Sequence, residues 1–94
     1  MTTKDHDGRD PLHDAALHND VSEVEKLLKS GSNPNHPDNL GFTPLHFAAQ
    51  ENAVEAARLL VTNGADANFQ NSYGNTPLGV AVFNYRGNGA MIEL

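Results

Sequence analysis

Histidines are the residues of this chain best suited to chemistry, because they bind zinc and transfer protons near neutral pH. The 94 residues include five of them: His6, His13, His18, His36 and His46. No two form a His-x-x-x-His or His-Glu-x-x-His pair, and there is no cysteine, so we expect no metal site and no thiol chemistry. His13 and His46 occupy equivalent positions of a repeated motif, which favours a structural role in a turn.

Carboxylates are the other candidates for chemistry. Asp5, Asp7 and Asp10 cluster near the N-terminus, and Glu23 and Glu25 lie on a predicted helix. Neither group accompanies a nucleophile or an apolar pocket that would shift a carboxyl pKa, so acid–base catalysis is not expected. Glycine-rich phosphate-binding motifs are also missing. We therefore expect a protein that is not an enzyme, with no catalytic residues and no cofactor.

The charge and hydropathy of the chain narrow the kinds of partner. The net charge is −6 at pH 7, and the six lysines and arginines are scattered, which argues against nucleic-acid binding. No apolar run approaches the roughly 18 residues needed to cross a membrane, and the polar N-terminus has no apolar signal core. We expect a cytoplasmic protein whose partner is another protein. Its acidity suits a basic partner, or solubility alone.

These residues are carried by elements that recur every 33 residues. Six columns keep one residue type in one register, which is the signature of a repeat architecture. The columns are Gly8, Gly41 and Gly74; Pro11, Pro44 and Pro77; Leu12, Leu45 and Leu78; Ala15, Ala48 and Ala81; Gly31 and Gly64; Asn35 and Asn68.

Each repeat predicts a pair of helices followed by a turn-rich loop. Thr43 is a good N-cap and Pro44 suits the first helical position, so a helix begins there. A second helix is expected from about 53 to 63, with apolar residues at helical spacing, and Gly64 ends it. The stretch 65–73 reads as an extended, turn-rich loop. Such units cannot bury their apolar faces alone, so they must stack.

Gly-Phe-Thr-Pro-Leu-His-Phe-Ala-Ala at 41–49 and Asn-Gly-Ala-Asp-Ala-Asn at 63–68 resemble the ankyrin-repeat signature. The resemblance covers nearly the whole chain after residue 5. It implies an all-α solenoid of stacked helix-turn-helix units with hairpin-like loops. We expect a single domain over 1–94, with units at about 8–40, 41–73 and an incomplete 74–94, and a flexible N-terminus over 1–6. The family's asparagine column, Asn35 and Asn68 here, implies bonds between loops and is a hydroxylation position in animal members.

Two departures from the family pattern concern the first turns of the units. Asp10 stands where the pattern has threonine and is expected to cap a helix equally well. Gly79 stands where the pattern has the histidine that links neighbouring turns, which predicts a looser junction at the third unit.

The two ends of the array differ. Glu23 and Lys26 occupy the columns that hold Ala56 and Leu59 in the second unit, which indicates a polar N-terminal cap. The third unit needs two extra residues near Tyr85 and Arg86, and it leaves apolar residues uncapped at Met91, Ile92 and Leu94. Three alternatives remain: a fragment of a longer array, an end completed by a partner or by self-association, or a short form with a frayed last helix.

The resemblance implies that a partner binds a concave face built from hairpin tips and first helices. Leu40, Phe42, Tyr73 and Phe83 place large apolar groups there that the repeat does not require, although they also suit a role in covering loops. The predicted protein-binding residues are Asn39, Leu40, Phe42, Gln50, Glu51, Phe69, Ser72, Tyr73, Asn75, Phe83 and Asn84.

Three functions are compatible with this surface. The first is a protein–protein interaction module. The second is a small inhibitor or immunity protein for one enzyme, such as a basic nuclease-type target. The third is an assembly element that pairs through the open C-terminal repeat, so the chain is either a monomer or self-associates there.

Overall fold

The computed structural model describes residues 8–84, with side chains through Val80. Within this range the chain forms helices and no strand, which confirms the expected all-α class. The expected flexible segment 1–6, the insertion near Tyr85 and Arg86, and the uncapped Met91, Ile92 and Leu94 lie outside the described residues. The described helices are α1 Pro11–Leu17, α2 Val21–Lys29, α3 Pro44–Gln50, α4 Val54–Thr62 and α5 Pro77–Asn84.

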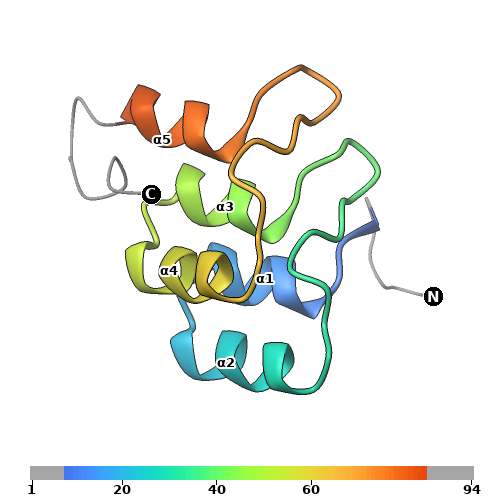
Figure 1. Ribbon diagram of the computed structural model, residues 1–94, viewed down its shortest axis with the longest axis vertical. Helices are drawn as coiled ribbons and strands as arrows, with labels where there is room; N and C mark the ends of the chain where they lie inside the picture. The colour runs from blue at the N-terminus through green and yellow to red at the C-terminus, as the bar shows by residue number, and fades with distance from the viewer. Residues whose placement is uncertain (1–7, 85–94) are drawn as a thin grey trace.

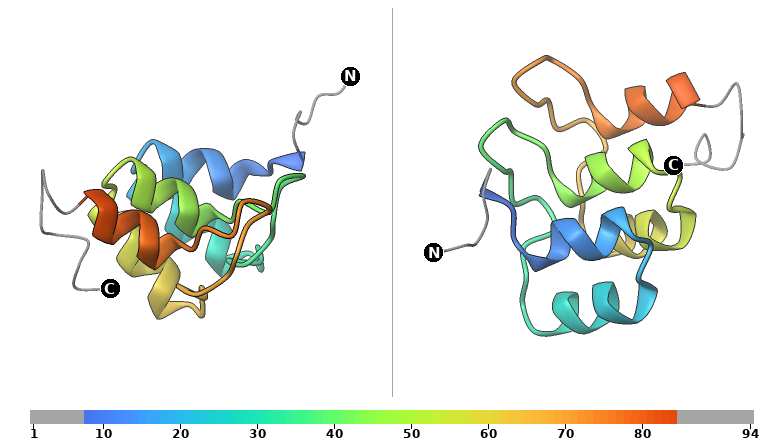
Figure 2. Two further views of the ribbon diagram at one scale, coloured as in Figure 1. Left: turned by 90° about the horizontal axis from the view of Figure 1, so that it is seen from above. Right: turned by 180° about the vertical axis from the view of Figure 1, so that it is seen from behind.

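The helices stack in two layers (Figures 1 and 2). The first helices of the units, α1, α3 and α5, lie side by side, and α3 packs against both of its neighbours. The second helices, α2 and α4, pack against each other in the layer beneath. The two long loops, between α2 and α3 and between α4 and α5, project from the same side of the stack (Figure 1). The predicted stacked helical pairs are thereby confirmed.

The first helices begin at the predicted caps. The Asp10 carboxylate accepts hydrogen bonds from the backbone N–H groups of Leu12 and His13, at 3.1 and 3.2 Å. Thr43 caps α3 in the same way, by accepting from the backbone N–H of His46 at 3.4 Å. These bonds satisfy N–H groups that have no partner inside the helix. The expectation that Asp10 replaces threonine as a cap is confirmed.

The start of α4 is capped by a residue from the preceding unit. Its own N-cap residue, Ala53, has no side chain that can accept a hydrogen bond. Instead the Asn19 side-chain oxygen accepts from the backbone N–H of Ala56 at 3.1 Å, and the Asn19 amide donates to Glu55 at 3.2 Å. Asn19 adopts a φ of 54°, which asparagine tolerates better than most residues. One side chain thus joins two units.

The core lies between the two layers and between neighbouring units. Small residues dominate it, so the helices approach closely and pack with few voids. Ala56 is fully buried on α4, whereas in the same column of α2 Glu23 is half-buried, and Lys26 of the next such column is exposed. This pattern fits the polar outer face expected of the first unit. The buried apolar cluster comprises Leu12, Ala15, Ala16, Val24, Leu45, Ala48, Ala49, Ala53, Ala56, Ala57 and Leu60. No helix in residues 8–84 has the length and apolar character needed to span a membrane.

Candidate protein-binding surface

Two equivalent loop tips, 38–42 and 71–75, are built around one buried polar side chain each. In the first, the Asp38 carboxylate accepts from the N–H groups of Leu40 and Phe42, at 2.9 and 2.8 Å. The Asp38 N–H also donates to the Phe42 carbonyl at 2.8 Å, which closes the tip. Because Asp38 bonds to Leu40 through its side chain and to Phe42 through both its side chain and its backbone, the backbone of the tip is held in one conformation.

In the second tip, Asn71 takes the role of Asp38. Its side-chain oxygen accepts from the N–H groups of Tyr73 and Asn75, at 2.9 and 3.0 Å. The Asn71 N–H donates to the Asn75 carbonyl at 2.9 Å. An amide in one tip and a carboxylate in the other therefore play the same part. In each tip the side-chain oxygen accepts from the N–H groups two and four residues further along the chain.

A backbone hydrogen bond joins the two tips directly. The N–H of Ser72 donates to the Leu40 carbonyl at 2.8 Å. Gly41 makes this approach possible, because its φ is +85° and a Cβ there would lie 2.8 Å from the Asn71 Cα. Only glycine combines that conformation with that contact at low cost. The glycine column of the repeat is thus explained at its middle member by loop packing.

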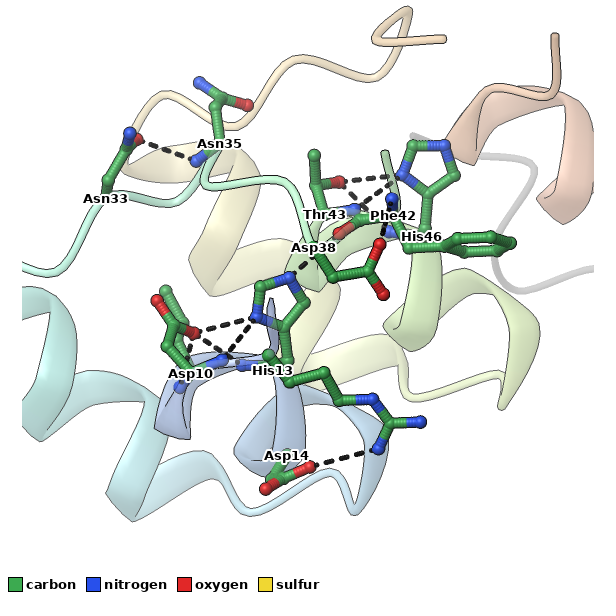
Figure 3. Close-up of polar contacts among 11 residues, drawn as sticks. Asp10, His13, Asp14, Asn33, Asn35, Asp38, Phe42, Thr43 and His46 are labelled. Carbon is green, nitrogen blue, oxygen red and sulfur yellow. Dashed lines mark hydrogen bonds and ion pairs between the residues drawn. The ribbon is translucent and has the colours of Figure 1, made fainter. Parts of the chain in front are cut away.

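His13 and His46 link the first turn of one unit to the loop of the next, as their column predicted. Nε2 of His13 lies 2.8 Å from the Phe42 carbonyl, and Nε2 of His46 lies 3.0 Å from the Asn75 carbonyl. Figure 3 shows His13 between the Asp10 cap and Phe42, and His46 beside Thr43. The two buried imidazoles therefore hold the loop tips in position.

The protonation of His46 follows from its partners. Its Nδ1 accepts a hydrogen bond from the Thr43 backbone N–H at 3.0 Å, so this nitrogen carries no proton and Nε2 donates to Asn75. Burial lowers the pKa of His46 below its ordinary value of 6.5, because the charged imidazolium loses its hydration. The hydrogen bond to the Asn75 carbonyl and the nearby Asp38 carboxylate act in the opposite direction. His46 is therefore a neutral structural group at neutral pH.

Asn35 bonds the neighbouring loop, as expected for its column. Its amide donates to the Gly64 carbonyl at 3.0 Å, and its side-chain oxygen accepts from the Asp66 N–H at 2.7 Å. Asn35 and the loop segment beside it appear in Figure 3. The equivalent Asn68 is exposed and makes no such bond within residues 8–84. At Asn35, where the structure describes both loops, this column thus joins one loop to the next.

Five predicted binding residues gather as one exposed patch on the joined tips. Tyr73 is 65% exposed and Leu40 is 44% exposed, and they are the most exposed large apolar residues among those described. The other three members are polar and exposed. We call this set the loop-tip patch; it consists of Asn39, Leu40, Ser72, Tyr73 and Asn75.

Phe42 and Phe69 are half-buried rather than free. The Phe42 ring stacks on Phe47 with a centroid distance of 5.5 Å, and its centroid lies 6.2 Å from that of Tyr73. The Phe69 ring meets His46 edge-on at 6.5 Å. The Phe42 ring thus covers α3 and supports Tyr73, which is the covering role that the sequence left open beside a role in binding.

The remaining predicted residues lie away from the loop-tip patch. Gln50 ends α3 and Glu51 follows it, at the opposite end of that helix, and both are exposed. Phe83 and Asn84 form the last turn of α5, and their side chains lie outside the described part of the structure. The eleven predicted residues therefore divide into a loop group and a helix-end group rather than forming one cluster.

The sequence reasoning missed Phe47 and Arg9. Phe47 is only 7% exposed, although it lies on α3 in the column of Asp14 and Val80. The Arg9 guanidinium lies 4.9 Å from the centre of the Phe47 ring and 3.4 Å from the Asp14 carboxylate. The available signal was the column itself. Its residue type changes in every unit, whereas the next column keeps alanine at Ala15, Ala48 and Ala81, so the repeat does not determine this position.

Among residues 8–84, no group of three or more histidines, aspartates or glutamates is arranged to hold a metal ion. The buried imidazoles and carboxylates described above are all engaged in turns and caps. What the arrangement offers to another molecule is therefore a rigid, partly aromatic surface.

Two comparisons with known proteins bear on this arrangement. A family model described as ankyrin repeats, three copies, matches residues 12–94. None of the curated proteins compared with the chain matches it.

Proposed function

Since this chain belongs to the ankyrin-repeat family, we propose that it is a binding module that holds a partner protein against its loop-tip patch and first helices. Members of this family generally act in protein–protein interaction, and the fold by itself does not select the partner. The residues that recognise the partner are those predicted from the sequence, with the loop-tip patch at their centre.

The observation that carries this proposal is the exposure of Tyr73. Tyr73 is 65% exposed, and Leu40 on the adjoining loop tip is 44% exposed, so both leave apolar area in water that the fold does not bury. Aromatic residues with a polar rim are typical of binding hot spots. Asn39, Ser72 and Asn75 supply such a rim.

The loop tips are also suited to binding because they are held before a partner arrives. Asn71 fixes the backbone of Tyr73, and the Ser72 N–H bond to Leu40 fixes one tip against the other. His46 holds the same tip from below through Asn75. A preorganised surface loses little conformational entropy on binding, so more of the contact energy appears as affinity.

The test is capture of a partner from a lysate of the source cells, followed by mass spectrometry. Wild type is compared with Tyr73→Ser, and the matched control is Val61→Ser, because Val61 is a 36% exposed apolar residue on α4 in the other helix layer. We expect one protein to be retained by the wild type and the control but lost with Tyr73→Ser. Loss of a hot-spot tyrosine weakens binding by about thirtyfold or more.

Circular dichroism must show equal helicity in all three proteins for the comparison to count. Retention of the same partner by Tyr73→Ser would exclude the loop-tip patch as the centre of binding. Loss of that partner by Val61→Ser alone would move the interface to the second-helix layer.

An inhibitor or immunity protein for one basic enzyme is the second candidate, and the charge distribution favours it. Residues 8–84 carry nine carboxylates against four lysines and arginines. Such an imbalance steers a basic partner toward the surface. The association rate with that partner should then fall steeply as salt rises, whereas an association rate independent of salt would count against this candidate.

Assembly through the C-terminal repeat is the third candidate. It concerns residues 85–94, whose sequence includes Met91, Ile92 and Leu94. Sedimentation over a range of concentrations tests it: growth in size with concentration is expected for self-association, and a constant monomer would exclude it.

A further inference from the structure

Arg9 occupies a place on the first-helix layer that is built to hold a guanidinium group. Its guanidinium carbon lies 4.9 Å from the centre of the Phe47 ring, within the range of a cation–π contact. One of its terminal nitrogens lies 3.4 Å from the Asp14 carboxylate. An aromatic face and a carboxylate at these distances are the two groups that recognise arginine most specifically.

The Phe47 ring belongs to a larger aromatic group. Phe42 stacks on it at 5.5 Å, and His13 meets it edge-on at 5.6 Å. Phe42 in turn contacts Tyr73, which belongs to the loop-tip patch. The guanidinium position is therefore continuous with the surface that we propose to bind a partner.

Arg9 does not satisfy this position fully. Its Nε is buried and has no hydrogen-bond partner in the described structure, which leaves a charged donor unpaired. Its contact with Asp14 is a single long bond, and the Arg9 and Asp14 side chains are 35% and 59% exposed. An ion pair that water reaches in this way contributes little to stability. The polar contacts of Arg9 are thus weak, and a better-placed guanidinium can replace it.

The local charge favours a cationic replacement. The other lysines and arginines of residues 8–84, which are Lys26, Lys29 and Arg58, lie on the second helices α2 and α4. Without Arg9, the charged residues that the described first helices and loop tips present would all be acidic, including Asp14 and Glu51. A basic partner therefore meets complementary charge there.

We propose that Phe47 and Asp14 form an arginine-binding subsite, which Arg9 fills in the free protein and which an arginine side chain of a basic partner protein takes over. This inference rests on the proposed function, because it names the chemistry of the partner at that surface. The incoming arginine stacks on Phe47 and pairs with Asp14, while the Arg9 side chain rotates into solvent. Arg9 thereby acts as an internal competitor that lowers affinity for partners lacking a well-placed arginine.

The subsite is tested by titrating ¹⁵N-labelled protein with N-acetyl-arginine amide and following backbone amide shifts by NMR. Arg9→Ala empties the subsite, so we expect its dissociation constant for the probe to be about fivefold lower than that of the wild type. Adding Asp14→Asn to Arg9→Ala should remove that gain. N-acetyl-lysine amide is the matched probe, and it should bind more weakly because an ammonium stacks and pairs less well than a guanidinium.

A second measurement uses the unaltered chain and so does not depend on the folding of a variant. The Nε–H signal of Arg9 should be displaced by the Phe47 ring current, and it should move toward the position of a free arginine as the probe is added. Equal affinities of wild type and Arg9→Ala, or an undisplaced Arg9 signal, would overturn the subsite.

This outcome is separable from that of the proposed function. If the titration fails while capture of a partner still depends on Tyr73, the arginine subsite is wrong and the binding function stands. If Arg9→Ala binds the probe but no partner depends on Tyr73, the subsite stands and the proposed loop-tip interface is wrong.

Discussion

Removal of the His46 side chain should destabilise the protein far more than removal of any exposed histidine. The imidazole is 1% exposed and accepts a hydrogen bond from the Thr43 backbone N–H at 3.0 Å. It also lies 2.9 Å from the Thr43 hydroxyl and donates to the Asn75 carbonyl at 3.0 Å. His46→Ala removes all three contacts and leaves a space where the ring was.

The magnitude follows from these contacts. Thr43 is fully buried, so its N–H and hydroxyl lose partners that water cannot replace, at about 1 kcal/mol each. The lost ring contacts add about 1 kcal/mol as a cavity. The Asn75 carbonyl also accepts a hydrogen bond from the Asn71 N–H at 2.9 Å, so it is not left without a donor and adds little. The free energy of unfolding should therefore fall by about 3 kcal/mol, a large share of the roughly 5–14 kcal/mol typical of a domain this size.

Urea denaturation followed by far-ultraviolet circular dichroism at pH 7.5 measures this loss. For a domain of this size, 3 kcal/mol lowers the midpoint by about 2 M. His18→Ala is the matched control, because His18 is exposed and its ring bonds only to a carbonyl of its own helix. A midpoint for His46→Ala within about 0.5 M of the control would refute the structural role assigned to the imidazole.

Three further predictions concern the same framework. Burial lowers the pKa of His46 below its ordinary value of 6.5, so as pH falls the imidazole takes up a proton more readily in the unfolded chain than in the folded one. The stability present above pH 6.5 should therefore be lost as pH falls toward the folded pKa. The difference between the urea midpoints at pH 7.5 and pH 5.5 should be smaller in His46→Gln than in the wild type. Asn35→Ala should lower the free energy of unfolding by about 1 kcal/mol, because it removes two hydrogen bonds to the neighbouring loop, whereas Asn68→Ala should be nearly neutral. Equal urea midpoints for the two variants would contradict this. Gly41→Ala should lower the free energy of unfolding by about 2–3 kcal/mol, and Gly64→Ala by about 1 kcal/mol. Both glycines have a positive φ, but only a Cβ at Gly41 would meet another backbone segment within 4 Å. Thermal unfolding of both variants measures the difference.

Much of the fold was predictable because its determinants are local. The cap residues Asp10 and Thr43, followed by proline, define where helices begin without any knowledge of the neighbouring unit. The glycine and histidine columns recur every 33 residues because each unit makes the same contact with the next. A repeat array thus reveals its tertiary contacts through its periodicity, which a sequence without repeats does not do.

The packing of side chains in variable columns was not predictable in this way. Phe47 shares a column with Asp14, so the repeat gives no reason to expect an almost fully buried ring there. Its burial depends on Arg9, which directly precedes the cap of α1, and on Phe42, which lies in the loop before α3. The cap that Asn19 supplies to α4 is likewise a contact between units, and no local pattern in either unit indicates it.

The candidate surface was predicted in its parts but not in its arrangement. Leu40 and Tyr73 are exposed as the pattern indicated, because each directly precedes the glycine of its own loop tip, Gly41 or Gly74, and no column requires them. Phe42 follows Gly41 but turns toward α3, since Phe47 and His46 offer it rings to pack on. A difference of two positions around one glycine therefore decides between a free side chain and a packed one.

Capture of a partner by the wild type and by Tyr73→Ser is the measurement that tests the proposed interface most directly. Val61→Ser is the control, because it also replaces an exposed apolar side chain by serine but on the other helix layer. We expect one protein to be retained by the wild type and by Val61→Ser, and to be lost with a Tyr73→Ser protein of unchanged helicity. Retention of the same protein by all three would contradict binding through the loop-tip patch.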